Sequence, residues 1–264
     1  MRYAVVGASG RMGRAIVRLG REMADATLVA AVSEQDIGQD AGLLAGVGSL
    51  GVKIVAPLEA LTQAGADVVI DFSAPAVTLE LAPLLANAGV RLVSGTTGLG
   101  DEHKGALANA ATQVAVLWEP NMSMGVHVLG RLVEQAVRAL GPAYDIEIVE
   151  THHRMKIDAP SGTAILLAQK AKSAREDTTY IYGREGKPGA RKPSEIAVLA
   201  MRGGDVIGDH SVHLMALGER LELTHRATNR DVFAHGALRA AAWMATRGPG
   251  SYSLADVIGP VLRN

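Results

Sequence analysis

Short apolar runs alternate with longer amphipathic segments through roughly the first half of the chain. Buried parallel strands are continuous apolar runs, whereas surface helices carry apolar residues three or four positions apart. These patterns predict strands at residues 3–6, 28–32, 52–55, 67–72, 90–94 and 114–118, a glycine-rich loop at 38–51, and helices at 12–23, 57–64, 75–88 and 101–111. Such regular alternation predicts an α/β fold with a Rossmann-like, doubly wound parallel sheet.

The spacing of hydrophobic and polar residues changes after Asn121. One long helix is expected at 124–140, and alternating polar and apolar residues favour strands that have one face in water. The expected strands have antiparallel character and lie at 145–151, 195–202, 210–217 and 220–227, with a mobile loop at 182–193 and a closing helix at 232–246. We therefore expect a dinucleotide-binding domain from residues 1–123 and 232–264, and a smaller α+β mixed-sheet domain from 124–231.

Composition narrows the class of protein. With 264 residues, 48% hydrophobic and 20% charged, the chain can bury one large or two modest cores. A net charge of −1 argues against nucleic acid or an anionic membrane as a partner. The absence of cysteine excludes disulfides and thiolate catalysis. No leader-like or membrane-spanning pattern is present, so we expect a cytoplasmic protein.

A glycine-rich loop directly follows the first expected strand and opens the first helix. Its spacing, G-x-x-G-x-x-G, is a variant of the dinucleotide-binding fingerprint, in which glycines permit a tight turn, close approach of a pyrophosphate and close helix packing. The candidate cofactor residues of this loop are Gly7, Ala8, Ser9, Gly10, Arg11, Met12 and Gly13.

An acidic residue about 20 positions further on is expected to hold the adenosine ribose. Glu34 lies at that distance and follows Ser33, with no Arg or Lys beside it to receive a 2′-phosphate. This favours NADH over NADPH. Two further loops follow later strands and should reach the same carboxyl edge of the sheet, where the nicotinamide half would lie. Their candidate residues are Gly95, Thr96 and Thr97 in one loop, and Glu119, Pro120, Asn121 and Met122 in the other.

Residues 150–164 form the most chemically loaded segment. They place two adjacent histidines, an arginine and a lysine before a turn, Asp-Ala-Pro-Ser-Gly-Thr, that leads into an expected helix. Positive side chains together with the free N–H groups of a helix start would bind a carboxylate-rich small molecule. Paired histidines also suggest zinc, but the chain has no Cys and the segment has no carboxylate at a convincing ligand spacing, so we expect no metal.

Taken together, these motifs resemble the 4-hydroxy-tetrahydrodipicolinate reductase (dihydrodipicolinate reductase) family along essentially the whole chain. The most specific is His-His-Arg-x-Lys-x-Asp-Ala-Pro-Ser-Gly-Thr at 152–163. The other matching segments are 7–13, 71–73, 95–98, 121–126, 202–205 and 233–237. The resemblance implies a homotetramer in which the second domain binds substrate and mediates oligomerisation. It also implies NADH- or NADPH-dependent reduction of a cyclic imine dicarboxylate in lysine and diaminopimelate synthesis.

The resemblance also implies residue roles. His152 would be the acid/base and Lys156 the proton donor, while His153, Ser161, Gly162 and Thr163 would bind substrate carboxylates. We expect Arg154 and Lys156 to lower the pKa of His152 by repulsion, and a bound dicarboxylate to raise it.

Two positions depart from the family pattern. The family commonly has an acidic residue followed by Arg or Lys after the second strand. In an ungapped alignment, Ser33 takes the position of the acidic residue and Glu34 that of the basic one, so either residue could hold the ribose. Met122 stands where an aromatic side chain is common.

Two alternatives remain. One is a non-catalytic sensor of NAD(P)H, which the lack of a basic patch disfavours. The other is a Rossmann oxidoreductase acting on a different small anion, such as a sugar or biliverdin-type enzyme. A semialdehyde dehydrogenase would need a catalytic cysteine.

Overall fold

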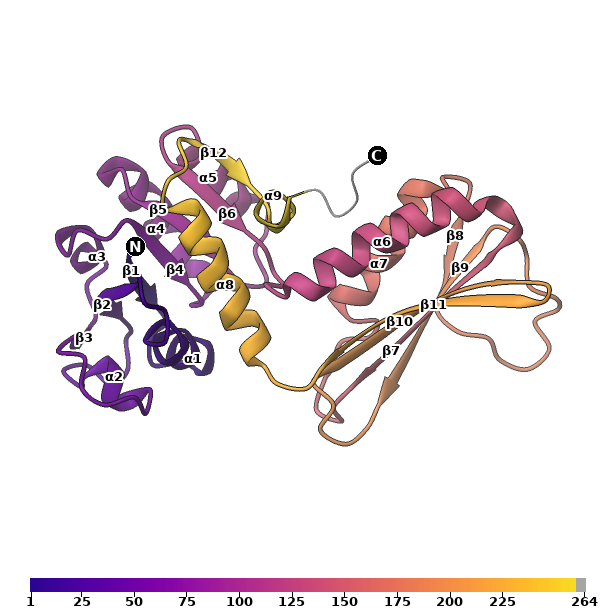
Figure 1. Ribbon diagram of the computed structural model, residues 1–264, viewed down its shortest axis with the longest axis horizontal. Coiled ribbons are helices and arrows are strands. Elements are labelled where there is room, and N and C mark those ends of the chain that lie inside the picture. The colour runs from indigo at the N-terminus through magenta and orange to yellow at the C-terminus, as the bar shows by residue number, and fades with distance from the viewer. Residues whose placement is uncertain (260–264) are drawn as a thin grey trace. The chain divides into compact units, whose positions relative to one another are not determined.

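The chain forms two compact units in the computed structural model, which describes residues 1–259 (Figure 1). The first unit contains Met1–Ser123 and Asp231–Gly259, and the second contains Met124–Arg230. The first unit is therefore discontinuous in sequence. The last five residues of the expected dinucleotide-binding domain, 260–264, lie outside the described part of the chain.

The first unit is built on a seven-stranded sheet in which every pairing is parallel. Its order is β12-β6-β5-β4-β1-β2-β3. The strands are β1 (Arg2–Val6), β2 (Thr27–Val32), β3 (Ile54–Val55), β4 (Val68–Asp71), β5 (Arg91–Ser94), β6 (Ala115–Trp118) and β12 (Gly250–Tyr252). The expected Rossmann-like sheet is confirmed, and its order reverses between β1 and β4, where such folds bind ligands.

Helices cover both faces of this sheet, because consecutive side chains of a buried strand point to opposite sides. One face packs against α1 (Arg11–Gly20) and α8 (Asp231–Met244), which also contact each other. On the other face, Ala4, Val69 and Leu92 share a core cluster with side chains of the helices that follow β3, β4 and β5. These helices are α3 (Glu59–Gln63), α4 (Pro75–Ala88) and α5 (Asp101–Ala110).

Several short elements of the first unit were not predicted. The loop at residues 38–51 contains a single helical turn, α2 (Ala41–Leu44), whose first amides donate to the Asp40 carboxylate. The strand β12 and the helix α9 (Leu254–Ile258) follow α8. Each spans five residues or fewer, which is too short for a periodic pattern to emerge.

The second unit is a five-stranded mixed sheet of order β11-β10-β7-β9-β8. Its strands are β7 (Asp145–His152), β8 (Thr179–Ile181), β9 (Glu195–Arg202), β10 (Gly208–Ala216) and β11 (Glu219–Ala227). The long helices α6 (Met124–Leu140) and α7 (Gly162–Ala174) contact each other and pack on the sheet, and a short 3₁₀ turn, η1 (Gly141–Ala143), follows α6. Ile148, Val198 and Val212 share a core with Leu167 of α7.

The antiparallel character expected for residues 195–202 is wrong. Strand β9 runs parallel to both β7 and β8, while β7–β10 and β10–β11 are antiparallel. The cause is the connections. Helix α7 returns the chain before β8, and the segment 182–194 returns it again before β9, so all three strands run in one direction.

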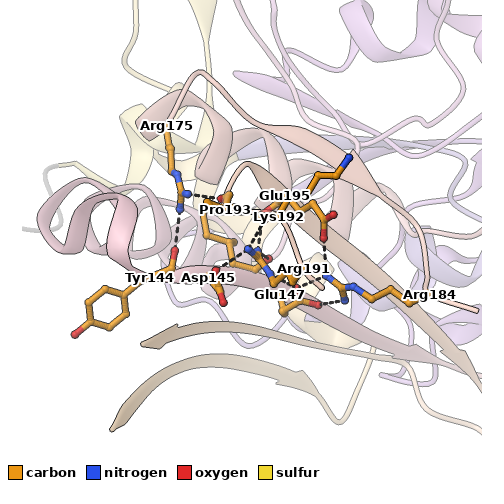
Figure 2. Close-up of polar contacts among 10 residues, drawn as sticks. Tyr144, Asp145, Glu147, Arg175, Arg184, Arg191, Lys192, Pro193 and Glu195 are labelled. Atoms are coloured by element: carbon orange, nitrogen blue, oxygen red, sulfur yellow. Dashed lines mark hydrogen bonds and ion pairs between the residues drawn. The ribbon is translucent and has the colours of Figure 1, made fainter. Parts of the chain in front are cut away.

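The connecting loop 182–193, expected to be mobile, is anchored to β7 by two arginines (Figure 2). Arg184 donates to both oxygens of Glu147, at 2.9 and 2.8 Å, and to Glu195 at 3.0 Å. Arg191 donates to Glu147 at 2.9 Å and to Asp145 at 2.6 Å. These charge-assisted contacts hold the loop against the strand.

Candidate active site

The glycine-rich loop between β1 and α1 leaves no room for side chains at two of its glycines. Gly7 has φ +77°, and a Cβ there would lie 2.4 Å from the Phe72 carbonyl oxygen. A Cβ on Gly13 would lie 2.2 Å from the Gly7 carbonyl oxygen. Gly10 precedes α1 without a side-chain cap, so the first amides of the helix are left for a ligand. This cradle fits the pyrophosphate of a dinucleotide.

The end of β2 and the loop that follows it are hydrogen-bonded to the glycine-rich loop at residues 7–13. The amides of Gly7 and Ala8 both donate to the Val32 carbonyl, and the Ser9 hydroxyl donates to the Gln35 carbonyl at 2.8 Å. Ser33 is half-buried and its hydroxyl accepts from the Gln35 amide, whereas Glu34 is exposed. The candidate pyrophosphate and ribose residues therefore lie side by side.

A buried carboxylate organises the loops after β4 and β5. Asp71 is fully buried and accepts hydrogen bonds from the hydroxyls of Ser73, Ser94 and Thr96. Gly95 packs flat on Phe72, because a Cβ there would lie 2.3 Å from the ring. Thr96 is buried and Thr97 is exposed. Sequence reasoning had assigned Asp71 no role.

The loop after β6 is joined to the same network. The Trp118 indole donates to the Thr96 carbonyl at 2.9 Å, and the Glu119 amide donates to the Ser94 carbonyl at 3.0 Å. Glu119 and Asn121 are half-buried and Pro120 is exposed. Met122 is 1% exposed, so its side chain belongs to the core. The candidate cofactor residues thus gather at the carboxyl edge of one sheet.

In the second unit, the expected anion site falls at the start of α7. Ser161 caps the helix, and its hydroxyl accepts from the Ala164 amide at 3.2 Å and contacts His210 Nε2 at 3.1 Å. The Ser161 amide donates to Glu150. These polar atoms of the buried Ser161 are therefore used within the fold, whereas the first two residues of the helix, Gly162 and Thr163, are exposed and half-buried.

His152 ends β7 and is held by a buried acid. Its Nδ1 lies 2.6 Å from Oε2 of Glu150, which is 0% exposed. Arg202 of β9 is directly paired with His152 in the sheet, and its guanidinium donates to both oxygens of Glu150 at 2.8 Å. The ring of His210, on β10, meets the His152 ring edge-on at 5.1 Å between centroids.

Burial and the charge of Glu150 shift the pKa of His152 in opposite directions. Burial lowers the pKa of His152 below its ordinary value, Glu150 acts to raise it, and Lys156 and Arg202 lower it further. The expected direction is present, although its main cause is burial, and Arg202 contributes where Arg154 was expected. Burial acts to raise the pKa of Glu150, but hydrogen bonds from Arg202, His152 and Ser161 outweigh it and leave that pKa lowered.

Two more candidate residues, Lys156 and His153, lie in the loop after β7. The Lys156 ammonium donates to Asp158 at 2.8 Å, and its side chain is 21% exposed. His153 is half-buried, and its Nε2 lies 3.4 Å from the Arg230 guanidinium. Within residues 1–259, no group of three or more His, Cys, Asp or Glu side chains is placed to hold a metal ion.

Glu150, Arg202 and His210 are the site residues that sequence reasoning missed. Glu150 lies two positions before His152 on one strand, so a shared face was deducible from the period of two. Arg202 was not deducible, because its approach depends on the parallel pairing of β7 with β9.

The fold and these two candidate sites are typical of two-domain oxidoreductases, a class whose members take a dinucleotide in one domain and a small molecule in the other. Residues 1–122 match the protein-family domain "Dihydrodipicolinate reductase, N-terminus", and residues 125–258 match "Dihydrodipicolinate reductase, C-terminus". The chain belongs to the dihydrodipicolinate reductase family.

Individual relatives are similar over nearly their full length. The chain is 46% identical to the 4-hydroxy-tetrahydrodipicolinate reductase of Myxococcus xanthus, covering 98% of both chains. It is 50% identical to that of an Anaeromyxobacter species, covering 97% of this chain and 96% of the relative. Among solved structures, dipicolinate-bound dihydrodipicolinate reductase from Paenisporosarcina superposes with a TM-score of 0.80 at 26% identity, covering 98% of this chain and 99% of that one. The expected family is confirmed.

Within the described residues, no helix has the length and apolar character needed to cross a membrane.

Proposed function

We propose that this chain reduces 4-hydroxy-tetrahydrodipicolinate to tetrahydrodipicolinate in the synthesis of diaminopimelate and lysine, and that His152 and Lys156 are its catalytic residues. The chain is an NAD(P)H-dependent oxidoreductase of the family identified above. The observation that carries the residue assignment is the single cluster at the end of β7. There, His152, Lys156 and the start of α7 combine a proton source with receptors for a dicarboxylate.

The dicarboxylate is held by donors from two segments. The first-turn groups of α7, at Gly162 and Thr163, orient one carboxylate through the amides and the helix dipole. His153, whose Nε2 lies 3.4 Å from the Arg230 guanidinium, is assigned to the other. A dipicolinate-bound relative supports a small dicarboxylate as the ligand class. Ser161 supports this arrangement from beneath, through its cap and its contact with His210.

Protonation is the chemical step assigned to this chain's side chains. Loss of the ring hydroxyl as water leaves a conjugated ring. The reduced nicotinamide, when bound, supplies hydride to that ring, and the electrons move toward the ring nitrogen. His152 or Lys156 then delivers a proton to the enamine-like anion. Before substrate binds, the low pKa of His152 keeps its ring largely neutral. The two carboxylates of a bound substrate would raise that pKa, so substrate binding itself would favour the protonated form of His152.

The cofactor is assigned to the loops at the carboxyl edge of the first unit. The pyrophosphate is assigned to residues 7–13, the ribose to Ser33 or Glu34, and the nicotinamide half to residues 95–97 and 119–122. The exposed Glu34 is free to reach the ribose, while the Ser33 hydroxyl is engaged with Gln35. A carboxylate repels a 2′-phosphate, so we propose a preference for NADH. The buried Met122 would contribute through its backbone.

The family resemblance further supports a homotetramer that works in the cytoplasm, as the pathway and the absence of cysteine suggest. Light scattering during size-exclusion chromatography tests the assembly. A monomeric mass would contradict this part of the proposal and leave the reaction untouched.

The reaction is tested by following loss of the reduced-nicotinamide absorbance while the preceding enzyme generates substrate from pyruvate and aspartate semialdehyde. NADH and NADPH are compared in parallel. Oxidation that depends on substrate supports the reductase, and the faster cofactor decides the preference. Binding of NADH without oxidation would favour a sensor of the nucleotide. Turnover only with a different small anion would favour another Rossmann oxidoreductase.

A further inference from the structure

The buried carboxylate of Glu150 connects the two halves of the substrate site. Its Oε2 lies 2.6 Å from His152 Nδ1, and its Oε1 accepts from the Ser161 amide at 3.0 Å, immediately before α7. We propose that Glu150 is a positioning residue for the reduction, which fixes the tautomer of His152 and the place of the α7 anion site relative to it. This inference rests on the proposed role of His152.

The proton on His152 follows from the partners of Glu150. Arg202 donates to both carboxylate oxygens at 2.8 Å and also to the Asp158 carbonyl at 2.7 Å. This bidentate pair keeps Glu150 ionised, and an ionised carboxylate can only accept hydrogen bonds. Nδ1 of His152 must therefore carry the proton that it shares with Glu150. In the neutral ring, Nε2 is then the unprotonated nitrogen and the only one that can exchange a proton with substrate.

The charge of Glu150 also opposes the effect of burial on His152. The ionisable groups around the ring are Glu150 on the same strand, Arg202 on β9, His210 on β10 and Lys156 in the following loop. Among these, only Glu150 favours the charged imidazolium, because the other three are cationic or become so. Without Glu150 the acid form would therefore be reached only at lower pH.

The chain contains a matched control on the same strand. Glu147 is also buried and also held by arginines, here Arg184 and Arg191 (Figure 2), but it lies three positions before Glu150 and so on the opposite face of β7. No contact links it to His152 in the described structure. A general requirement for an arginine-bound acid in β7 would affect both residues, whereas the proposed role affects Glu150 alone.

The experiment compares Glu150→Gln with Glu147→Gln in the full-length protein. Steady-state kinetics across pH are combined with long-range ¹H–¹⁵N correlation spectra of the His152 ring, assigned with a His152→Gln variant. In Glu150→Gln we expect kcat to fall about 10- to 100-fold, as for outer-shell partners of functional histidines. The limb of the pH profile on which activity falls with rising pH, which reports loss of the His152 proton, should move to lower pH, and the Nε2-protonated tautomer should appear. NADH affinity should change little, and Glu150→Asp should recover part of kcat.

Glu147→Gln should retain the pH profile and tautomer of the unmodified chain. A Glu150→Gln enzyme with an unmoved profile and an unmoved tautomer would overturn the proposal, as would equal shifts in both variants. If Glu150→Gln does not fold, the unmodified protein decides the question, because a neutral His152 protonated on Nε2 contradicts the inference by itself. The spectra need no turnover, so absent reductase activity would count against the proposed function without touching this result.

Discussion

The close approach of α1 to the glycine-rich loop predicts a large effect of one methyl group. In Gly13→Ala, the new Cβ would lie 2.2 Å from the Gly7 carbonyl oxygen and 2.6 Å from Ala8 Cα, and both of these atoms belong to the backbone. Ordinary contact begins at 3.4 Å, so the start of α1 must retreat from the loop by about 1 Å or the loop must distort. Such overpacking costs about 1–3 kcal/mol.

The net effect on stability includes helix propensity. Alanine is favoured over glycine in a helix by up to about 1 kcal/mol, which leaves a net loss of about 2 kcal/mol when the clash is near the upper end of its range. For a unit of about 150 residues, this corresponds to a midpoint lowered by roughly 4–8 °C. We also expect NADH affinity to fall by about tenfold or more, since the displaced amides are those assigned to the pyrophosphate.

Calorimetry and a fluorescence titration with NADH measure the two effects. Gly105→Ala is the control, because Gly105 is an exposed position within α5 where a Cβ meets nothing within 4 Å. That variant should gain about 1 kcal/mol and bind NADH normally. If Gly13→Ala behaves like Gly105→Ala in both measurements, the packing argument for the cofactor loop is refuted.

Three further predictions concern the chemistry of the two sites. Lys156→Met should lower kcat about 100-fold with little change in the NADH dissociation constant. The control is Lys172→Met, since the ammonium of Lys172 lies over the Tyr180 ring. Equal turnover in the two variants would remove Lys156 from the mechanism. Glu34→Ala should raise the NADPH-to-NADH ratio of kcat/KM by about tenfold, and Ser33→Ala should be the more effective variant if Ser33 holds the ribose instead. Burial lowers the pKa of His210 from 6.5 to about 4, so the unfolded chain binds a proton that the folded chain refuses. The free energy of unfolding should therefore fall by on the order of 3 kcal/mol between pH 6.5 and 4, and urea titrations of His210→Gln should show a shallower fall.

Much of the first unit could be predicted because its determinants are local. Six buried strands are readable as apolar runs, and the glycine spacing identifies the loop between β1 and α1 without any tertiary information. The direction of β9 could not be predicted in this way, since it depends on how α7 and the 182–194 segment return the chain. Alternation of polar and apolar residues reports which face is wet and is silent on strand direction.

The residue types of the candidate substrate site could be predicted, but the contacts among its side chains could not. The segment 150–164 predicts an anion site near a helix start, but the sequence does not reveal that the Ser161 hydroxyl contacts His210. The partnership of Arg202 with Glu150 crosses 52 positions and depends on strand register. Arg191, in the loop that was expected to be mobile, anchors that loop to Glu147 and Asp145.

The discontinuity of the first unit has a consequence for how the protein is made. Helix α8 packs against α1, β4 and β5, and its buried residues include Ala234, Ala237 and Leu238. These contacts are supplied only after residues 124–230 have left the ribosome. Until then, the part of the first unit's sheet that α8 covers, over β4 and β5, stays uncovered, whereas the second unit is contiguous and has all its strands before α8 emerges. The order of synthesis thus makes the N-terminal unit the last to be completed, and exposes it longest to aggregation and to chaperones.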